Sequence, residues 1–322
     1  MKVRFWGTRG SLPVALTASD VRKKIVAALS AANGRQFASS AEIESFTDTL
    51  PFSVAGGFGG HSSCVELITG GDEHVICDLG SGARPLGQAK IAEFGPGRPQ
   101  TYHIFLSHLH WDHLMGLPFF VPIYIPGNRI VIHSCHANAA EAVRLQMSAP
   151  CFPVDFSQIG ASVEFDLLEP DRPDRPYLIA GLSVTAKRQL HAGDSYGYRF
   201  EQEGKAVVYS TDSEHHVEDR EERESFVRFF SGADLVVFDA MYCLADAISL
   251  KADWGHSSNI VAVELCQEAA VRRLAMFHHE PVYDDEQLSQ LLLDTRRFEE
   301  ISRDGRAPLE VFSAYDGLTM TL

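Results

Sequence analysis

The stretch Ser107-His108-Leu109-His110-Trp111-Asp112-His113 places four side chains that can bind metal within six residues. It follows an apolar run at residues 103–106, whose aromatic and β-branched composition predicts a buried strand. Residues 114–118 end in a proline, so only a short helical turn can follow the motif. Because His108 and His110 are two residues apart, an extended loop points both imidazoles the same way.

Asp112 and His113 turn away from that pair. One loop can therefore give two ligands to one metal ion and two to a neighbouring metal ion. A single histidine is more often a surface or core residue than a ligand. Three histidines and an aspartate at the end of a strand are hard to explain by packing, because each imidazole needs its own hydrogen-bond partner. Zinc-like ions prefer histidine nitrogen and carboxylate oxygen, so we interpret the motif as a metal site.

The pattern His-x-His-x-Asp-His after a β-strand resembles the signature of the metallo-β-lactamase superfamily, and this chain matches it without a gap. The resemblance implies an α/β fold, a four-layer αββα sandwich in which two mixed central sheets are flanked by helices. It covers essentially the whole chain, so we expect a single domain over residues 1–322. The main departure is an insertion at about residues 14–55, which could be a lid or a dimer contact. Its residues 19–32 predict a helix with Ser19 or Asp20 as N-cap.

The resemblance also implies ligands from later parts of the chain. His191 lies in a turn before an alternating strand pattern at 196–200 and matches the third histidine of the family. Asp212 follows a buried strand at 206–210 and matches the carboxylate that bridges both metals. The alternative role for Asp212 is the N-cap of an acidic helix at 214–224.

A histidine pair follows the strand expected at 273–277. The family pattern strand-His-x-x-Pro matches His278 as the final ligand, and His279 is the alternative or faces the pocket. The implied cofactor is a pair of divalent metal ions, expected to be zinc, although manganese and iron accept the same ligands. Metal one would take His108, His110 and His191, metal two would take Asp112, His113 and His278, and Asp212 would bridge them.

Two further residues are expected near the metals. Asp78 ends a buried strand before a glycine turn, where the family typically has an aspartate that supports the metal loop; capping the turn is a compatible role. Arg9 lies in the glycine-rich turn after the first strand, where it either meets a substrate anion or is a solvated surface residue.

Gly255-His256-Ser257 precedes a helix expected at 259–270. An imidazole at a helix N-terminus lies where anions bind favourably. Gly-His-Ser at this place resembles the phosphodiesterase or ribonuclease Z-like branch of the superfamily. The resemblance assigns His256 a catalytic role, in which it steadies the phosphoryl oxygens or protonates the leaving group. Asp112 is expected to orient the nucleophile, a hydroxide shared by the two metals.

These residues predict a metal-dependent hydrolase, most simply a phosphodiesterase acting on a small or cyclic phosphodiester. The alternative is a thioester or lactone hydrolase of the glyoxalase II or lactonase kind on the same dinuclear site, although those branches need no Gly-His-Ser. A transfer-RNA 3′-end endonuclease is a narrower variant that usually needs a lysine-rich arm, and residues 118–176 are not basic. A non-catalytic metal-binding regulatory module is the least economical alternative.

The bulk composition constrains partners and compartment. The chain has 322 residues and a net charge of −15, which argues against a large nucleic acid as partner because that partner requires a basic surface. The six cysteines are scattered, and the N-terminus has no apolar signal segment. We therefore expect a cytoplasmic protein without membrane contact, and a homodimer is compatible because relatives are often dimers.

Overall fold

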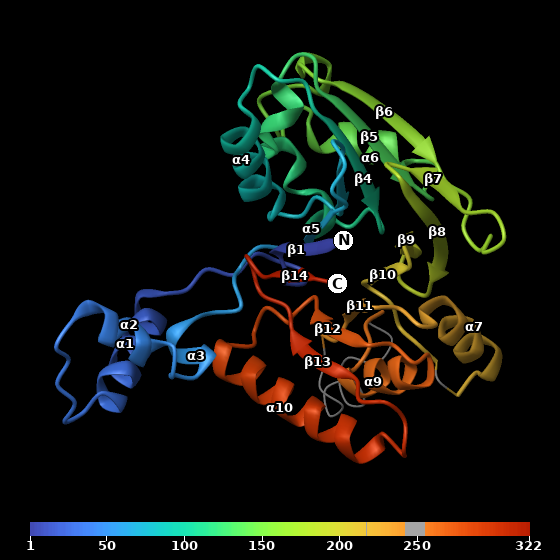
Figure 1. The fold of residues 1–322 in the computed structure, drawn as a ribbon. Coiled ribbons are helices and arrows are strands. Elements are labelled where there is room, and N and C mark those ends of the chain that lie inside the picture. Colours follow the sequence, from blue (N-terminus) through green and yellow to red (C-terminus); the bar gives the residue numbers. More distant parts are fainter. Residues whose placement is uncertain (217, 242–254) are drawn as a thin grey trace.

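The computed structural model describes residues 1–216, 218–241 and 255–322, and Figure 1 shows their arrangement. Two seven-stranded mixed sheets lie face to face, and helices cover their outer faces. This four-layer αββα sandwich confirms the predicted fold class. The loop or short helix predicted at 242–252 lies outside the described residues.

The first sheet has the strand order β14-β1-β2-β3-β4-β5-β6. Its strands are β1 (Lys2–Gly7), β2 (Cys64–Ile68), β3 (His74–Cys77), β4 (Thr101–Leu106), β5 (Arg129–Ser134), β6 (Ser162–Leu167) and β14 (Thr319–Thr321). Strands β3 to β6 are parallel, whereas β14, β1 and β2 pair antiparallel. Helices α4 (Ala83–Phe94) and α6 (Ala139–Gln146) pack on its outer face through residues such as Leu86 and Val143.

The second sheet has the strand order β13-β12-β11-β10-β9-β8-β7. Its strands are β7 (Tyr177–Ile179), β8 (Leu182–Gln189), β9 (Ser195–Gln202), β10 (Lys205–Ser210), β11 (Leu235–Asp239), β12 (Arg273–Phe277) and β13 (Glu310–Ser313). Strands β10 to β13 are parallel. Helices α7 (Arg220–Phe230), α9 (Asn259–Glu268) and α10 (Asp285–Ser302) cover the outer face, as Figure 1 shows.

The core between the sheets is rich in aromatic side chains. Phe5 and Phe105 from the first sheet meet Tyr198, Phe200 and Phe277 from the second, and all five are fully buried. Burying a large apolar side chain of this kind contributes roughly 1.5–3 kcal/mol each. The inward-facing side chains of the two sheets therefore hold the sheets together. They alternate along the strands with side chains that face outward.

Two local predictions differ from the structure. Residues 178–188 resemble one strand in sequence, but β7 and β8 form a hairpin because Ala180 and Gly181 both have positive φ and reverse the chain. The three prolines among residues 118–126 predict an irregular loop beside the site, but this part of the chain forms short 3₁₀ turns, η1 (Leu117–Phe119) and η2 (Val121–Tyr124).

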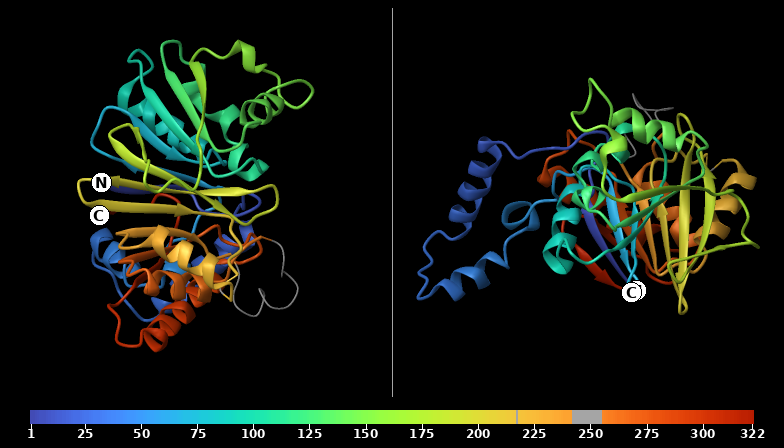
Figure 2. Two further views of the ribbon diagram at one scale, coloured as in Figure 1. Left: turned by 90° about the vertical axis from the view of Figure 1, so that its right-hand side faces the viewer. Right: turned by 90° about the horizontal axis from the view of Figure 1, so that it is seen from above.

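Residues 14–55, which we call the arm, contain α1 (Ala18–Ala31), α2 (Ser40–Thr47) and α3 (Phe52–Ala55). Figure 2 shows α1 and α2 projecting from the sandwich. The N-cap of α1 is Thr17, whose side chain accepts a hydrogen bond from the Asp20 backbone, so the prediction of Ser19 or Asp20 as cap was wrong. Lys24 attaches the arm to the body, because its Nζ lies 2.6 Å from Asp285 Oδ2 at the start of α10.

His215 is a buried imidazole in the helical layer of the second sheet. Its ring centroid lies 4.3 Å from that of Phe226 and 5.1 Å from that of Phe238. Neither ring nitrogen has a hydrogen-bond partner among the described residues. Burial, with a smaller contribution from the Lys187 cation, lowers the pKa of His215 to about 3.

The low pKa of His215 predicts acid sensitivity of the fold. An unfolded histidine takes up a proton below about pH 6.5 while buried His215 does not, so stability is lost as pH falls from about 6.5 towards 3. His215 alone should lower the free energy of unfolding by about 1.4 kcal/mol between pH 7.5 and 5.5. Urea unfolding in the presence of a chelator should therefore show a loss of stability over this pH range that is about 1.4 kcal/mol smaller in His215→Phe than in the wild type. Phe226→Leu, which perturbs the same packing without removing a titratable group, should keep the wild-type loss; an unchanged pH dependence in His215→Phe would contradict the assignment.

Candidate metal centre

The side chains of the candidate centre come from the carboxyl ends of strands in both sheets. The motif at 108–113 follows β4, while Asp212 and His278 follow β10 and β12 of the second sheet. His191 lies in the turn between β8 and β9. Because β4 belongs to one sheet and β10 and β12 to the other, the centre lies where the two layers meet.

The predicted ligands of metal one lie together. His110 Nδ1 is 3.1 Å from His191 Nε2. His108 Nε2 and His191 Nε2 lie 3.6 Å and 3.9 Å from the same oxygen, Asp212 Oδ2. The side chains of His108, His110 and His191 thus form one group that could hold a metal ion.

The predicted ligands of metal two form a second group beside the first. His113 Nε2 lies 3.2 Å from Asp112 Oδ2 and 3.4 Å from His278 Nε2. Asp212 presents Oδ1 to His113 at 3.3 Å and Oδ2 to His278 at 3.3 Å. Since Asp212 Oδ2 also faces the first group, its carboxylate lies between the two sets of ligands.

These residues fit divalent cations. Ligand atoms of a tetrahedral zinc ion, each about 2.0–2.1 Å from the metal, lie about 3.3 Å from one another, close to the separations in the second group. His108 Nε2 is buried in the first group without a hydrogen-bond partner among the described residues, as expected for a nitrogen with a ligand role. The donor set of imidazole nitrogens and carboxylate oxygens suits zinc, manganese or iron.

Two histidines are fixed in the tautomer that a metal requires. His113 Nδ1 lies 2.8 Å from Asp78 Oδ2, and His191 Nδ1 lies 2.8 Å from the carbonyl oxygen of Gly255. Both oxygens can only accept, so each Nδ1 donates and each Nε2 is the ring nitrogen that faces the centre, where a metal ion could bind it.

Asp78 contacts the loop that carries the motif at residues 108–113. It is fully buried, and its Oδ1 accepts the Ser107 backbone N–H at 2.8 Å. Its Oδ2 accepts from Ser107 Oγ, from His113 Nδ1 and, across the sheets, from Tyr209 OH at 2.8 Å. One carboxylate therefore holds both the backbone and a ligand of the loop.

Burial and charge oppose each other in the cluster. Burial raises the pKa of the Asp112 carboxyl, but His113 and His278 outweigh it and hold that pKa well below its usual range. Burial lowers the pKa of His113, but Asp212, Asp112 and Asp78 outweigh it and raise the pKa. Burial, followed by the charge of His113, lowers the pKa of His108. The carboxylates thus stay ionised and attract positive charge into the centre.

His256 stands beside both groups. Its Nδ1 donates to Asp239 Oδ2 at 2.7 Å, and its ring stacks on His278 with centroids 5.1 Å apart. Its centroid is 5.3 Å from that of His191. Burial lowers the pKa of His256, but the ion pair and hydrogen bond with Asp239 outweigh burial and raise the pKa to about 9.

The model of the β-lactamase superfamily domain matches residues 81–279, which is more than half of the chain. The chain belongs to the β-lactamase superfamily. It is a hydrolase of the metallo-β-lactamase fold, a family that binds divalent metals, and its similarity is to the ribonuclease Z-like members.

Curated relatives of this superfamily member include ribonuclease Z of Haloferax volcanii, 26% identical over 259 residues that make up 66% of this chain and 77% of the relative. Ribonuclease BN of Escherichia coli is 26% identical over 276 residues, 69% of this chain and 83% of the relative.

Solved structures with the same fold include YhfI of Bacillus subtilis, with a TM-score of 0.62, 17% identity and coverage of 99% of this chain and 98% of that one. The short form of human tRNase Z has a TM-score of 0.58 at 18% identity, covering 100% of this chain and 99% of that one. A diphosphatase of the PhnP family has a TM-score of 0.56 at 16% identity, covering 100% and 97%. At these identities the likeness shows the fold alone.

Two residues named from the superfamily pattern lie away from the ligand groups. The Arg9 guanidinium is buried, and it donates to the carbonyl oxygens of Gly59, Glu280 and Tyr283. These contacts favour a structural role over a substrate contact, and they contradict the alternative of a solvated surface residue. His279 Nε2 lies 2.8 Å from the Ala314 carbonyl oxygen, so His278 is the member of the pair that faces the centre.

Asp212 does not cap the following helix. The N-cap of α7 is Asp219, whose side chain accepts from the backbone N–H groups of Glu221 and Glu222. The alternative role of Asp212 as the helix cap was therefore wrong.

Three residues of the candidate centre have a strained backbone. Asp78 and His278 directly follow β3 and β12, Asp212 lies two residues after β10, and their φ values are 59°, 58° and 48° respectively. Such left-handed conformations are costly for residues other than glycine and cluster at functional sites. A Cβ added at Gly10 would lie 2.6 Å from the His278 ring, so glycine lets the turn after β1 pass directly beside this histidine.

The sequence prediction missed the supporting residues Asp239, Ser107 and Tyr209. Asp239 did carry a signal, since it ends a buried strand in the same way as Asp78 and Asp212. Ser107 lies within the motif itself, and nothing in the pattern around Tyr209 could have placed it against Asp78.

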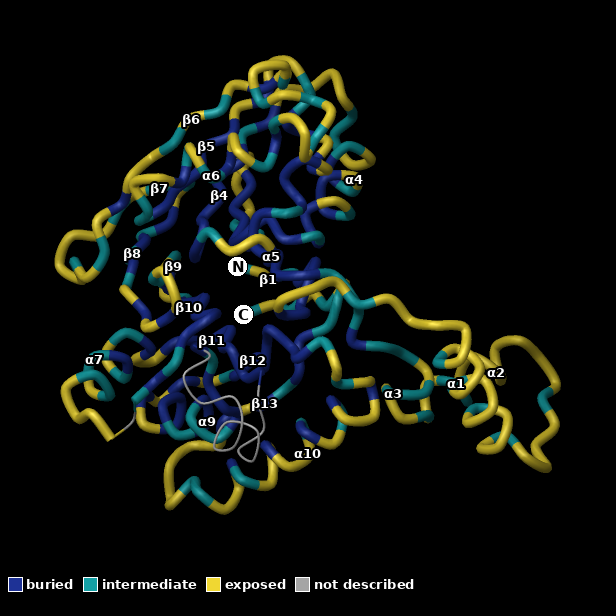
Figure 3. The backbone as a smooth tube through the Cα atoms, turned by 180° about the vertical axis from the view of Figure 1, so that it is seen from behind, coloured by how far each residue is buried: buried dark blue, intermediate teal, exposed yellow. Residues whose placement is uncertain are grey.

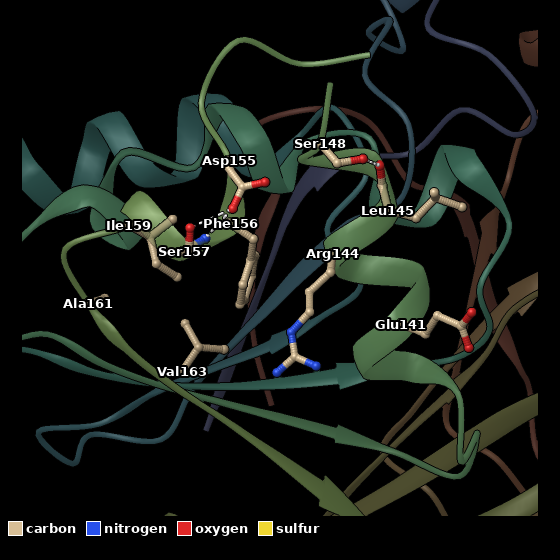
Figure 4. Close-up of a pocket in the computed structure, with 10 residues that line it drawn as sticks. All are labelled: Glu141, Arg144, Leu145, Ser148, Asp155, Phe156, Ser157, Ile159, Ala161 and Val163. Carbon is tan, nitrogen blue, oxygen red and sulfur yellow. Dashed lines mark hydrogen bonds between the residues drawn. The ribbon is translucent and has the colours of Figure 1, made fainter. Parts of the chain in front are cut away.

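A separate cavity of about 780 Å³ lies on the outer side of the first sheet between α6 and the 3₁₀ turn η3 (Phe156–Gln158). Figure 4 shows Arg144 and Phe156 projecting into it. Arg144 lies 5.7 Å from the ring centroid of Phe156. Its lining includes none of the predicted site residues, so we do not assign the reaction to it.

The position of Asp212 between the groups predicts that it controls metal binding at both. Asp212→Ala should reduce bound metal at both positions, because each loses a negatively charged oxygen. Elemental analysis of purified protein should therefore show less than half the wild-type metal content. Asp194→Ala is the matched control, since Asp194 also has a positive φ, 64°, but pairs with Arg188 at the surface. Full occupancy in Asp212→Ala would rule out a bridging role.

Proposed function

We propose that the chain is a dinuclear metal-dependent phosphodiesterase that acts on a small or cyclic phosphodiester. The observation that carries this proposal is the pair formed by His256 and Asp239, which stands against the ligand residues His278 and His191. An imidazole held in this way is suited to donating a proton to a leaving oxygen.

In the proposed site, His108, His110 and His191 would hold one metal ion, Asp112, His113 and His278 would hold the other, and Asp212 would be shared by both. Divalent cations bound there, zinc or else manganese or iron, would supply Lewis-acid stabilisation of charge on the phosphoryl oxygens and lower the pKa of a water molecule.

The chain's own residues supply orientation and proton transfer. The Asp112 carboxylate accepts a hydrogen bond from the attacking water and so directs a lone pair towards phosphorus. Asp239 holds His256 Nδ1, which directs Nε2 towards the leaving oxygen. His256 then transfers the Nε2 proton to that oxygen as the P–O bond breaks, so that the alkoxide leaves as a neutral alcohol.

A thioester or lactone hydrolase remains the alternative on the same ligands. A thiolate leaves without a proton, because a thiol has a pKa near 8.5, so a thioesterase has less need of an acid at His256. The contact between His256 and Asp239 therefore favours an alcohol leaving group, such as that of a phosphodiester, over the thiol of a thioester.

RNA is the second candidate substrate, because the curated relatives are named ribonucleases. A net charge of −15 disfavours a long polyanion, whose binding depends on many basic contacts. A substrate screen should therefore contain cyclic nucleotides, aryl phosphodiesters, thioesters and a structured RNA, all tested on protein of known metal content.

The role of His256 predicts an effect that depends on the leaving group. His256→Ala should keep both metals but lose roughly 10²- to 10⁴-fold in kcat on a nucleotide phosphodiester, which needs protonation of an alkoxide. The loss should be much smaller on bis-p-nitrophenyl phosphate, whose phenolate leaves unaided. Steady-state kinetics measure the loss of kcat on each substrate, and elemental analysis measures the metal content.

His216→Ala is the control for His256→Ala, because His216 is a partly exposed histidine that pairs with Glu214. Asp239→Asn should likewise lose more activity on the nucleotide phosphodiester than on bis-p-nitrophenyl phosphate. The reason is that it weakens the hydrogen bond that holds the His256 ring. Equal losses on both substrates would remove His256 from proton transfer.

Trp111 marks the substrate side of the centre. It lies between His110 and Asp112 and is 68% exposed, and it has no aromatic contact among the described residues. An indole is large and apolar, and exposed aromatic residues commonly stack on the bases or rings of ligands. We therefore assign Trp111 to binding a flat group on the substrate.

Loss of the Trp111 ring should affect flat substrates selectively. Trp111→Ala should raise KM for cyclic nucleotides and aryl phosphodiesters roughly 5- to 150-fold, the range expected for one lost stacking contact. KM for an alkyl phosphodiester and kcat for either should change little, and Trp111→Phe should restore most of the affinity. A uniform rise in KM for flat and alkyl substrates would contradict stacking.

A further inference from the structure

The helices α1 and α2 of the arm bury none of their residues in the described chain. Figure 3 shows this exposure along the arm. Of the eighteen large apolar side chains exposed among the described residues, seven belong to the arm: Leu16, Val21, Ile25, Val26, Leu29, Ile43 and Phe52. The arm is thus the part of the molecule where exposed apolar groups are most concentrated.

The apolar residues of α1 form a stripe. Val21, Ile25 and Leu29 recur every four residues, which places them on one face of the helix. A helix of 14 residues is only marginally stable in water without a packed face. The stripe therefore has the properties of a surface that a partner covers.

The charge of the arm argues for the kind of partner. The arm contains four acidic residues and four basic ones, so its net charge is zero, while the whole chain carries −15. The acidic residues are Asp20, Glu42, Glu44 and Asp48, and the basic ones are Arg22, Lys23, Lys24 and Arg35. A nucleic acid or an anionic membrane would require a basic excess that the arm does not have. Two copies of this chain repel each other, and the neutral arm is where that repulsion is weakest.

The unpaired charges of the arm are divided between its helices. Arg22 lies on α1, while Glu44 lies on α2 and Asp48 is its C-cap. None of these three side chains has an ion-pair partner among the described residues. Around a two-fold axis, α1 of one copy can face α2 of the other, so opposite charges meet twice.

We propose that the arm is the self-association surface of this protein. Two copies pair through the stripe formed by Val21, Ile25 and Leu29, with basic residues of α1 facing acidic residues of α2 across the two-fold axis. A stable interface uses about 20–30 residues from each partner, and the 42 residues of the arm are enough. The pairing leaves the metal ligands on the sandwich body and does not depend on the reaction.

Light scattering on the full-length protein tests the stripe. The chain mass is 35.5 kDa, so the wild type should elute with twice that mass and dissociate on dilution. Ile25→Glu combined with Leu29→Glu should give the monomer mass. The matched control is Leu293→Glu with Ile301→Glu, two exposed apolar residues of α10 in the body, which should remain dimeric. Far-UV circular dichroism checks that each variant is folded.

A charge exchange tests the contact between helices independently of apolar packing. Arg22→Glu with Lys23→Glu gives the arm a net charge of −4, and Glu44→Lys with Asp48→Lys gives it +4. Each variant alone should be monomeric, because like-charged arms repel, and an equal mixture should recover the dimer. A wild type that stays monomeric at every concentration, or a dimer insensitive to both sets of variants, would overturn the proposal. Binding of the monomer to anionic vesicles or RNA through the arm would overturn it as well.

Discussion

The buried carboxylate of Asp78 joins the parts of this molecule that must be held together. It follows β3 of the first sheet, fixes the loop after β4 through Ser107, and accepts a hydrogen bond from Tyr209 of the second sheet. It also holds His113 in the tautomer whose Nε2 faces the centre. The seam between the two sheets and the orientation of the metal loop therefore depend on the same group.

The candidate centre brings together buried negative charges, which need positive charge beside them. Asp78, Asp112, Asp212 and Asp239 are all at least nine-tenths buried. Buried carboxylates are costly unless they are paired or coordinate a cation. In the described structure imidazoles compensate them, which is why charge and hydrogen bonding raise the pKa values of His113 and His256 against the effect of burial. A dense set of carboxylates with neutral imidazoles such as His108 is the environment that suits divalent cations.

The sandwich is closely packed, whereas the arm leaves apolar side chains uncovered. The sandwich places its site residues with a core closed on both faces of each sheet, and it accepts left-handed backbone at Asp212 and His278 to aim them. The arm has no such core, and it is attached through Lys24 and α3. No helix in the described part of the chain has the length and apolar character needed to cross a bilayer.

The sequence alone determined the fold class and most of the centre, because the signals were local. Four candidate ligands lie within one loop, and alternating apolar residues mark the faces of most strands. Tertiary structure decided contacts between distant segments, such as that of Asp239 with His256, and the choice of His278 over its neighbour. It also decided that Arg9 donates hydrogen bonds to backbone carbonyl oxygens, and that the chain reverses at Ala180 and Gly181. The physical reason is that periodicity shows which side of an element is buried, whereas the residue it meets there depends on how the two sheets pack.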